Sequence, residues 1–157
     1  MTRTVIESKT KTVIIGFDEP FCVIGERINP TGRKKLAAEL EMGNFETVLR
    51  DAIEQVACGA TVLDVNSGAV FTNKMAEDPR YADNNFVEPP LMREMILRIQ
   101  EAVDVPLCID SSVPAALEAG LQSCEGRPLL NSVTGEEERL ERILPLVKKY
   151  NVPVVAI

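Results

Sequence analysis

The sequence predicts an α/β protein of the (β/α)8 TIM-barrel type, in which helices cover a parallel sheet. Strand-length apolar runs alternate with helical patterns in the order βαβαβαβαβ. These runs are continuously apolar, which is typical of strands buried on both faces of a parallel sheet. Residues 25–29 carry neither G-x-G-x-x-G nor a Walker A pattern, which favours a barrel over an open doubly wound sheet.

The predicted strands correspond to about the first five βα units of such a barrel. A complete barrel needs about 250 residues, whereas this chain has 157 and its last residues form the fifth predicted strand. A chain of this length can bury one core. Residues 1–157 are therefore expected to form a single domain, with the partial barrel at 21–157.

The N-terminal part contains two apolar runs, at 12–16 and 21–25, separated by the turn Asp18-Glu19-Pro20. Two such runs around a short turn predict a hairpin at about 10–25, or an N-terminal plug, before the main sheet. The later strands are predicted at 61–66, 106–110, 128–132 and 153–157.

Two helices are predicted in the first two thirds of the chain. Asn44 can cap a helix at 44–58 and Gly59 can end it. Residues 91–102 carry apolar side chains at helical spacing. The segment at 69–90 is rich in Asp, Asn and Pro, and it predicts a loop that is either functional or a tolerated surface insertion.

Two further helices are predicted from their N-terminal signals. Ser112 can cap a short helix that has Pro114 in its first turn. Thr134 and Glu137 form the two ends of a capping box, which predicts a helix from there onward. Its apolar face is expected to consist of Leu140, Ile143, Leu144 and Val147.

The composition argues against nucleic acid partners, and the lack of a long apolar run argues against a membrane span. The net charge of −7 and the pI of about 4.7 oppose binding to a phosphate backbone. Aromatic residues make up only 4% of the chain, so no stacking platform for single strands is expected. No apolar run approaches the roughly 20 residues that a membrane span requires.

The chain has no His, which excludes Ser-His-Asp catalysis, Cys-His catalysis and His-based metal sites. None of the four Cys residues forms a C-x-x-C pair, so no metal site is predicted. Cys22 and Cys108 lie in apolar runs and are expected to be small buried side chains. The start of the chain has no signal peptide, so the thiols are expected to be reduced in the cytoplasm.

Polar residues recur where the predicted strands end. In a parallel α/β protein the carboxyl ends of the strands meet at one mouth, and polar residues buried there without a function would be costly. Asp64 and Asn66 lie two residues apart and so share one face of their strand. The candidate site residues are Glu26, Asn29, Asp64, Asn66, Asp110 and Asn131.

Carboxylates and amides with no His and no basic cluster suit a neutral ligand that is rich in N–H donors. A pterin presents a ring N–H beside an exocyclic amino group, and one carboxylate can accept both hydrogen bonds. An Asn can read the neighbouring carbonyl or ring nitrogen. Purines and other amidines would fit the same residues, so these side chains alone leave the ligand open.

The motif Gly25-Glu26-Arg27-Ile28-Asn29-Pro30-Thr31-Gly32 resembles the signature of the methyltetrahydrofolate:corrinoid methyltransferases. This family includes the folate domain of cobalamin-dependent methionine synthase. Four further matches follow in order within 59–66, 108–111, 118–121 and 130–132, and the resemblance covers about 21–157. Dihydropteroate synthase, another pterin-binding (β/α)8 barrel, matches these motifs less well.

The resemblance implies a role for each candidate residue. Asp110 matches the family aspartate that holds the amino and ring N–H groups of the pterin, and Asn131 matches an asparagine that also hydrogen-bonds it. Asp64 and Asn66 match polar residues of the same pocket. Glu26 and Asn29 match the loop at the barrel mouth and have a supporting role.

The resemblance also implies the reaction. The N5-methyl of 5-methyltetrahydrofolate is transferred to the cobalt of a corrinoid (cobalamin) carried by a partner corrinoid protein. The catalytic group that assists at N5 is expected beyond residue 157. The alternatives are a dihydropteroate synthase-like enzyme and a non-catalytic pterin-binding partial barrel. Two open sheet edges would remain, so a homo-oligomer, such as a dimer, is expected.

Overall fold

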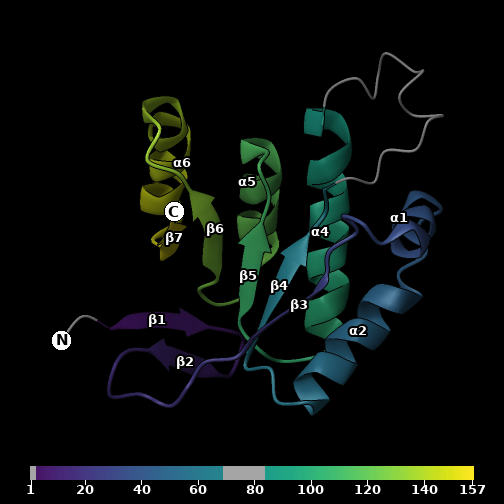
Figure 1. Cartoon of the computed structure of the whole chain (residues 1–157), viewed down its shortest axis with the longest axis horizontal. Coiled ribbons are helices and arrows are strands. Elements are labelled where there is room, and N and C mark those ends of the chain that lie inside the picture. Colours follow the sequence, from purple (N-terminus) through teal and green to yellow (C-terminus); the bar gives the residue numbers. More distant parts are fainter. Residues whose placement is uncertain (1–2, 69–83) are drawn as a thin grey trace.

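The computed structural model describes residues 3–68 and 84–157. Its main sheet has five parallel strands in the order β3-β4-β5-β6-β7, with helices between them (Figure 1). The fold class predicted from the sequence is confirmed as a partial (β/α)8 barrel. The strands are β3 (Ile24–Ile28), β4 (Val62–Asn66), β5 (Leu107–Asp110), β6 (Leu129–Val133) and β7 (Val154–Ala156).

The helices lie along the outer face of the sheet, where α4, α5 and α6 stand side by side (Figure 1). Outward-facing strand residues such as Leu63, Val65 and Ile109 are fully buried beneath them. The other face of the strands carries the polar residues at its carboxyl end and a smaller apolar cluster beneath them. The helices are α1 (Lys34–Glu41), α2 (Glu46–Ala57), α4 (Asn84–Ala102), α5 (Pro114–Ser123) and α6 (Glu137–Tyr150).

The predicted helix at 91–102 is the C-terminal part of α4. Its apolar residues at helical spacing are all fully buried in the main core: Met92, Met95, Ile96 and Ile99. The predicted loop at 69–90 is wrong for 84–90, because α4 begins at Asn84 and contains Pro89 and Pro90. The rest of that predicted loop, 69–83, lies outside the described residues.

The predicted pairing of 12–16 with 21–25 is wrong. The run at 12–16 forms β2 (Thr12–Ile15), which pairs antiparallel with β1 (Thr4–Glu7). The run at 21–25 instead leads into β3, where Ile24 pairs with Val62 of β4. Backbone hydrogen bonds hold this run beside β4, because the Val23 carbonyl accepts from the amides of Thr61 and Val62, while the side chains of Phe21, Val23 and Ile24 stay exposed.

The β1-β2 hairpin lies across the amino ends of the barrel strands (Figure 1), in the manner of the predicted plug. Ile6 of β1 is fully buried and packs against Val62, Cys108 and Leu129 in a second, smaller apolar cluster. Arg127 ties the hairpin to the barrel, since its guanidinium donates to the Val5 carbonyl at 2.9 Å and to the Asn151 carbonyl at 2.7 Å.

Two predicted helix caps are also wrong. The amide of Val113 donates to the hydroxyl of Ser111, not Ser112, at 2.9 Å, and α5 then begins at Pro114. At α6 the capping box does not form, because the N-cap is Glu136 and the buried Thr134 hydroxyl has no hydrogen-bond partner. Within the described residues, no helix is long and apolar enough to cross a membrane.

Candidate functional site

Strand register brings the polar residues of β4, β5 and β6 onto the inner face of the sheet. Asn66 is the register partner of Asp110, and Asp110 is the partner of Asn131. One step lower, Asp64 is the partner of Cys108. Side chains two residues apart share a face, so Asn66, Asp110 and Asn131 form one row at the carboxyl ends of the strands, and Asp64 lies in the row below it beside Cys108.

A cavity of about 320 Å³ opens on this face. Five of the six residues predicted from the sequence line it, and they come from four segments of the chain. Asn66 does not line the cavity but contacts Asp110, which does. The lining residues are Ile24, Glu26, Asn29, Asp64, Cys108, Asp110, Leu129, Asn131 and Val155.

Two cross-strand hydrogen bonds connect the polar side chains. The Asn66 amide nitrogen donates to Asp110 Oδ2 at 2.7 Å, and the Asn131 amide nitrogen donates to Asp64 Oδ1 at 3.2 Å. The orientation of Asn66 is fixed, because its Oδ1 accepts from the Gly68 amide at 2.7 Å. Each carboxylate thus keeps acceptor capacity for a ligand while an amide of the protein holds it in place.

Burial shifts the proton affinity of both aspartates. It raises the pKa of Asp64 from 3.8 to about 6, and the negative charges of Asp110 and Glu26 add to this shift. Hydrogen bonds from Cys108 and Asn131 to Asp64 act in the opposite direction. Burial also raises the pKa of Asp110, against the hydrogen bond from Asn66. Carboxyl groups with raised pKa values in a cavity are typical of functional sites.

Strand β3 and the loop after it place Glu26 and Asn29, respectively, at the mouth of the cavity. The side chain of Gln55 in α2 accepts from the Arg27 amide at 2.9 Å and so fixes the end of the strand. Asn29 accepts from the Thr31 amide at 2.9 Å, which shapes the turn. Glu26 itself is exposed. These contacts give the loop a defined shape at the rim.

Cys108 is predicted from the sequence only as a small buried side chain, and it is buried as predicted. The structure adds that its thiol lines the cavity floor and hydrogen-bonds Asp64. The spacing of two residues from Asp110 could have placed it on the inner face. Burial raises the pKa of this thiol, so it is a neutral group there. Cys22, also expected to be buried, is half-buried.

The described residues contain no group of three or more His, Cys, Asp or Glu side chains arranged to hold a metal ion. The carboxylates of the cavity are instead engaged by amide donors of the protein. Carboxylate and amide groups in this arrangement can bind a ligand edge that presents N–H groups.

The parallel sheet, its outer helices and the polar cavity at the carboxyl ends of the strands define a ligand-binding protein of the (β/α)-barrel class. Within this class the chain belongs to the pterin-binding enzymes, because residues 25–157 match the family described as pterin binding enzyme.

A curated relative supports this membership. The chain is 34% identical over 128 residues to the methylcorrinoid:tetrahydrofolate methyltransferase of Eubacterium limosum. The match covers 79% of this chain and 40% of that protein. The chain therefore spans less than half the length of this relative.

Solved structures of dihydropteroate synthases share the fold. The enzyme of Vibrio fischeri superposes with a TM-score of 0.57 at 17% identity, covering 98% of this chain and 50% of that one. The enzyme of Thermus thermophilus gives a TM-score of 0.51 at 20% identity, covering 94% and 46%. These likenesses concern the fold alone.

Proposed function

We propose that the cavity binds the pterin ring of a tetrahydrofolate. The main observation behind this proposal is a pair of carboxylates at the carboxyl ends of adjacent strands. Asp64 is buried, Asp110 is half-buried, and each accepts a hydrogen bond from an amide side chain of the protein. Asp110 accepts from the ring N–H and exocyclic amino group, and Asn131 reads the adjacent edge. Glu26 and Asn29 close the mouth beside the ring.

The proposed reaction is methyl transfer between N5 of tetrahydrofolate and a corrinoid on a partner protein. In the direction predicted from the sequence, the methyl group moves from N5 to the cobalt nucleophile. The electron pair of the broken N–C bond stays on nitrogen, which takes up a proton because a tertiary amine is a poor leaving group. The name of the Eubacterium limosum relative describes the opposite direction. The same groups serve both directions, since the two share one transition state.

The part of the reaction that we assign to this chain is orientation of the pterin. Holding one edge of the ring fixes where N5 and its methyl group face, which turns an encounter of two large partners into a defined approach. None of the six site residues is assigned the proton transfer at N5. The partner protein carries the corrinoid, and this chain supplies the pterin site.

Replacing Asp110 with Asn tests the pterin site. The amide matches the carboxylate in shape but presents an N–H group to a donor edge of the ligand. Loss of a charge-assisted hydrogen bond, with a donor facing a donor, is expected to weaken binding by about 2 kcal/mol or more, roughly thirtyfold. Isothermal titration calorimetry with 5-methyltetrahydrofolate measures the change.

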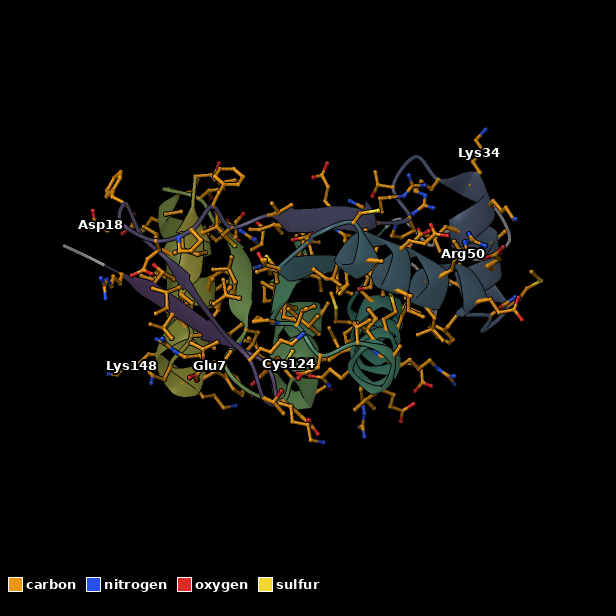
Figure 2. All side chains as sticks on the ribbon, turned by 90° about the horizontal axis from the view of Figure 1, so that it is seen from below. Glu7, Asp18, Lys34, Arg50, Cys124 and Lys148 are labelled. Atoms are coloured by element: carbon orange, nitrogen blue, oxygen red, sulfur yellow. The ribbon has the colours of Figure 1, made fainter. Side chains whose placement is uncertain are left out.

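Asp18→Asn is the matched control, because Asp18 is an exposed aspartate on the turn after β2 (Figure 2). It should bind like the wild type. A folded wild-type chain that does not bind methyltetrahydrofolate contradicts the proposal. So does a D110N variant that binds with unchanged affinity.

A further inference from the structure

A second cavity, of about 440 Å³, adjoins the first at the barrel mouth. Glu26 and Asn29 line both cavities, so a ligand in the first can extend into the second without crossing a wall of the protein. The remaining lining residues of the second cavity are Arg27, Thr31 and Arg33.

The two cavities differ in charge. Three carboxylates, Glu26, Asp64 and Asp110, line the first and no described cation does, whereas the second has two cations, Arg27 and Arg33, beside the shared Glu26. In a chain with a net charge of −7, this makes the second cavity a local site for anions. The carboxylates of the first cavity repel an anionic group attached to a ligand there, and the arginines of the second cavity attract it.

The two arginines differ in what they contact. Arg33 donates to Asp51 at 2.6 Å and to the Arg27 carbonyl, and it is 30% exposed beside a buried Asp51. Its charge is therefore largely offset within the protein. Arg27 is exposed and forms no ion pair with any described carboxylate, although its backbone is fixed by Gln55 and Arg33. Arg27 thus presents an uncompensated guanidinium from a fixed strand end.

We propose that the second cavity receives the glutamate tail of the folate, with Arg27 contacting a tail carboxylate. This rests on the proposed function, because the pterin ring must occupy the first cavity for its tail to reach the second. A guanidinium pairs with a carboxylate through two parallel hydrogen bonds, which a lysine cannot reproduce. Arg33 keeps the cavity in shape and adds a weaker attraction.

The test compares two probes, tetrahydrofolate and 6-methyltetrahydropterin, which shares the ring but lacks the tail. Arg27→Gln is expected to weaken tetrahydrofolate binding about fivefold, the size of one favourable exposed ion pair, and to leave 6-methyltetrahydropterin binding unchanged. The fivefold difference should shrink as salt is added, because salt screens exposed charges. Titration calorimetry of the full 157-residue chain measures both affinities.

Lys34→Gln is the charge-matched control. Lys34 lies one residue after Arg33, but its side chain points away from the molecule (Figure 2), and it lines neither cavity. It should leave both affinities unchanged. Arg27→Lys should restore part of the tetrahydrofolate affinity by returning the charge without the bidentate geometry.

The possible results separate the two proposals. Equal effects of R27Q on both probes, or no effect on either, overturn the tail contact while the pterin site stands. A K34Q variant that weakens tetrahydrofolate binding as much as R27Q also overturns the tail contact. In that case the loss of any nearby positive charge, and not of a specific contact, explains the weaker binding. Failure of the folded wild type to bind either probe overturns the proposed function and the tail contact with it.

Discussion

At the scale of single residues, burial of the Asp64 carboxylate in the cavity lowers the stability of the folded state. The pKa of Asp64 is about 6, against the usual 3.8. Between about pH 4 and 6 the folded state therefore holds more protons than the unfolded state, and stability falls as pH rises through this window. At 1.36 kcal/mol for each pKa unit, ionised Asp64 costs about 3 kcal/mol at pH 7.

Asp64→Asn removes this cost, because the amide stays neutral at every pH. The variant is expected to be more stable than the wild type by up to about 3 kcal/mol at pH 7, with the difference closing toward pH 4. Urea unfolding at several pH values measures the difference in free energy. Asp18→Asn replaces an exposed aspartate, and its stability relative to the wild type should not change with pH in this way. A constant difference for D64N across this range would contradict the assignment.

The site residues could be predicted because strand ends follow a simple rule. Asp64, Asp110 and Asn131 interrupt apolar strands, and parallel topology brings their ends together. The partners of these residues could not be predicted in the same way. That Asn66 contacts Asp110, and Asn131 contacts Asp64, depends on the register of neighbouring strands and on side-chain orientation. Arg33 lines the second cavity and pairs with Asp51 of α2, a contact that no local pattern indicates.

At the scale of elements, α5 lies close to β5 because Gly120 faces it. A Cβ at Gly120 would lie 2.5 Å from Ile109 Cγ2 and 3.1 Å from Met92 Cγ. The glycine therefore sets how near the helix approaches the strand that carries Asp110. Glycine is often found just after the end of a helix. Gly120 instead lies inside α5 and has a packing role.

Gly120→Ala is expected to lower the free energy of unfolding. Overpacking typically costs about 1–3 kcal/mol, and the 2.5 Å contact with Ile109 places this variant in the upper part of that range, at about 2–3 kcal/mol. Alanine returns up to about 1 kcal/mol of helix propensity, which leaves a net loss of about 1–2 kcal/mol. Gly135→Ala is the control, because nothing lies within 4 Å of a Cβ there, and it should change stability by less than about 0.5 kcal/mol. Chemical denaturation compares the two, and equal small effects would rule out the close contact.

Elements with a strong apolar pattern were predicted, and those without one were missed or misplaced. The helix α1 was not predicted, since it has no acidic residue in its first turn and no side-chain cap. Two leucines, Leu36 and Leu40, anchor it in the core instead. The start of α4 was missed because Pro89 and Pro90 disfavour helix locally, and tertiary packing of the residues that follow overrides this. The pairing of β2 with β1 depends on tertiary contacts, which a short apolar run in the sequence does not indicate.

At the scale of the whole molecule, the N-terminal hairpin and the cavity share a wall. Cys108 and Leu129 line the cavity and also pack against Ile6 of the hairpin, and Val155 lies between the same two regions. The floor of the candidate site is therefore part of a cluster that the first residues of the chain complete. Loosening the hairpin should affect the site at a distance.

Ile6→Ala leaves a cavity in this cluster, and we expect a loss of about 2–5 kcal/mol of stability together with weaker pterin binding. Phe17→Ala, on the same N-terminal segment, should change stability by less than about 0.5 kcal/mol because Phe17 is 95% exposed. Thermal unfolding and calorimetric titration of both variants measure these effects. Normal binding by a destabilised I6A chain would show that the floor does not depend on the hairpin.

The alternation of side chains along the strands divides the work of each strand between two faces. Outer residues such as Leu63 and Leu130 pack in the main core, and inner residues such as Asp64 and Asn131 line the cavity. Because the polar inner residues lie outside the main core, mutations at these positions can accumulate without dismantling it. Such a scaffold is well suited to divergence: new ligand preferences can arise, by selection or by engineering, while the chain continues to fold.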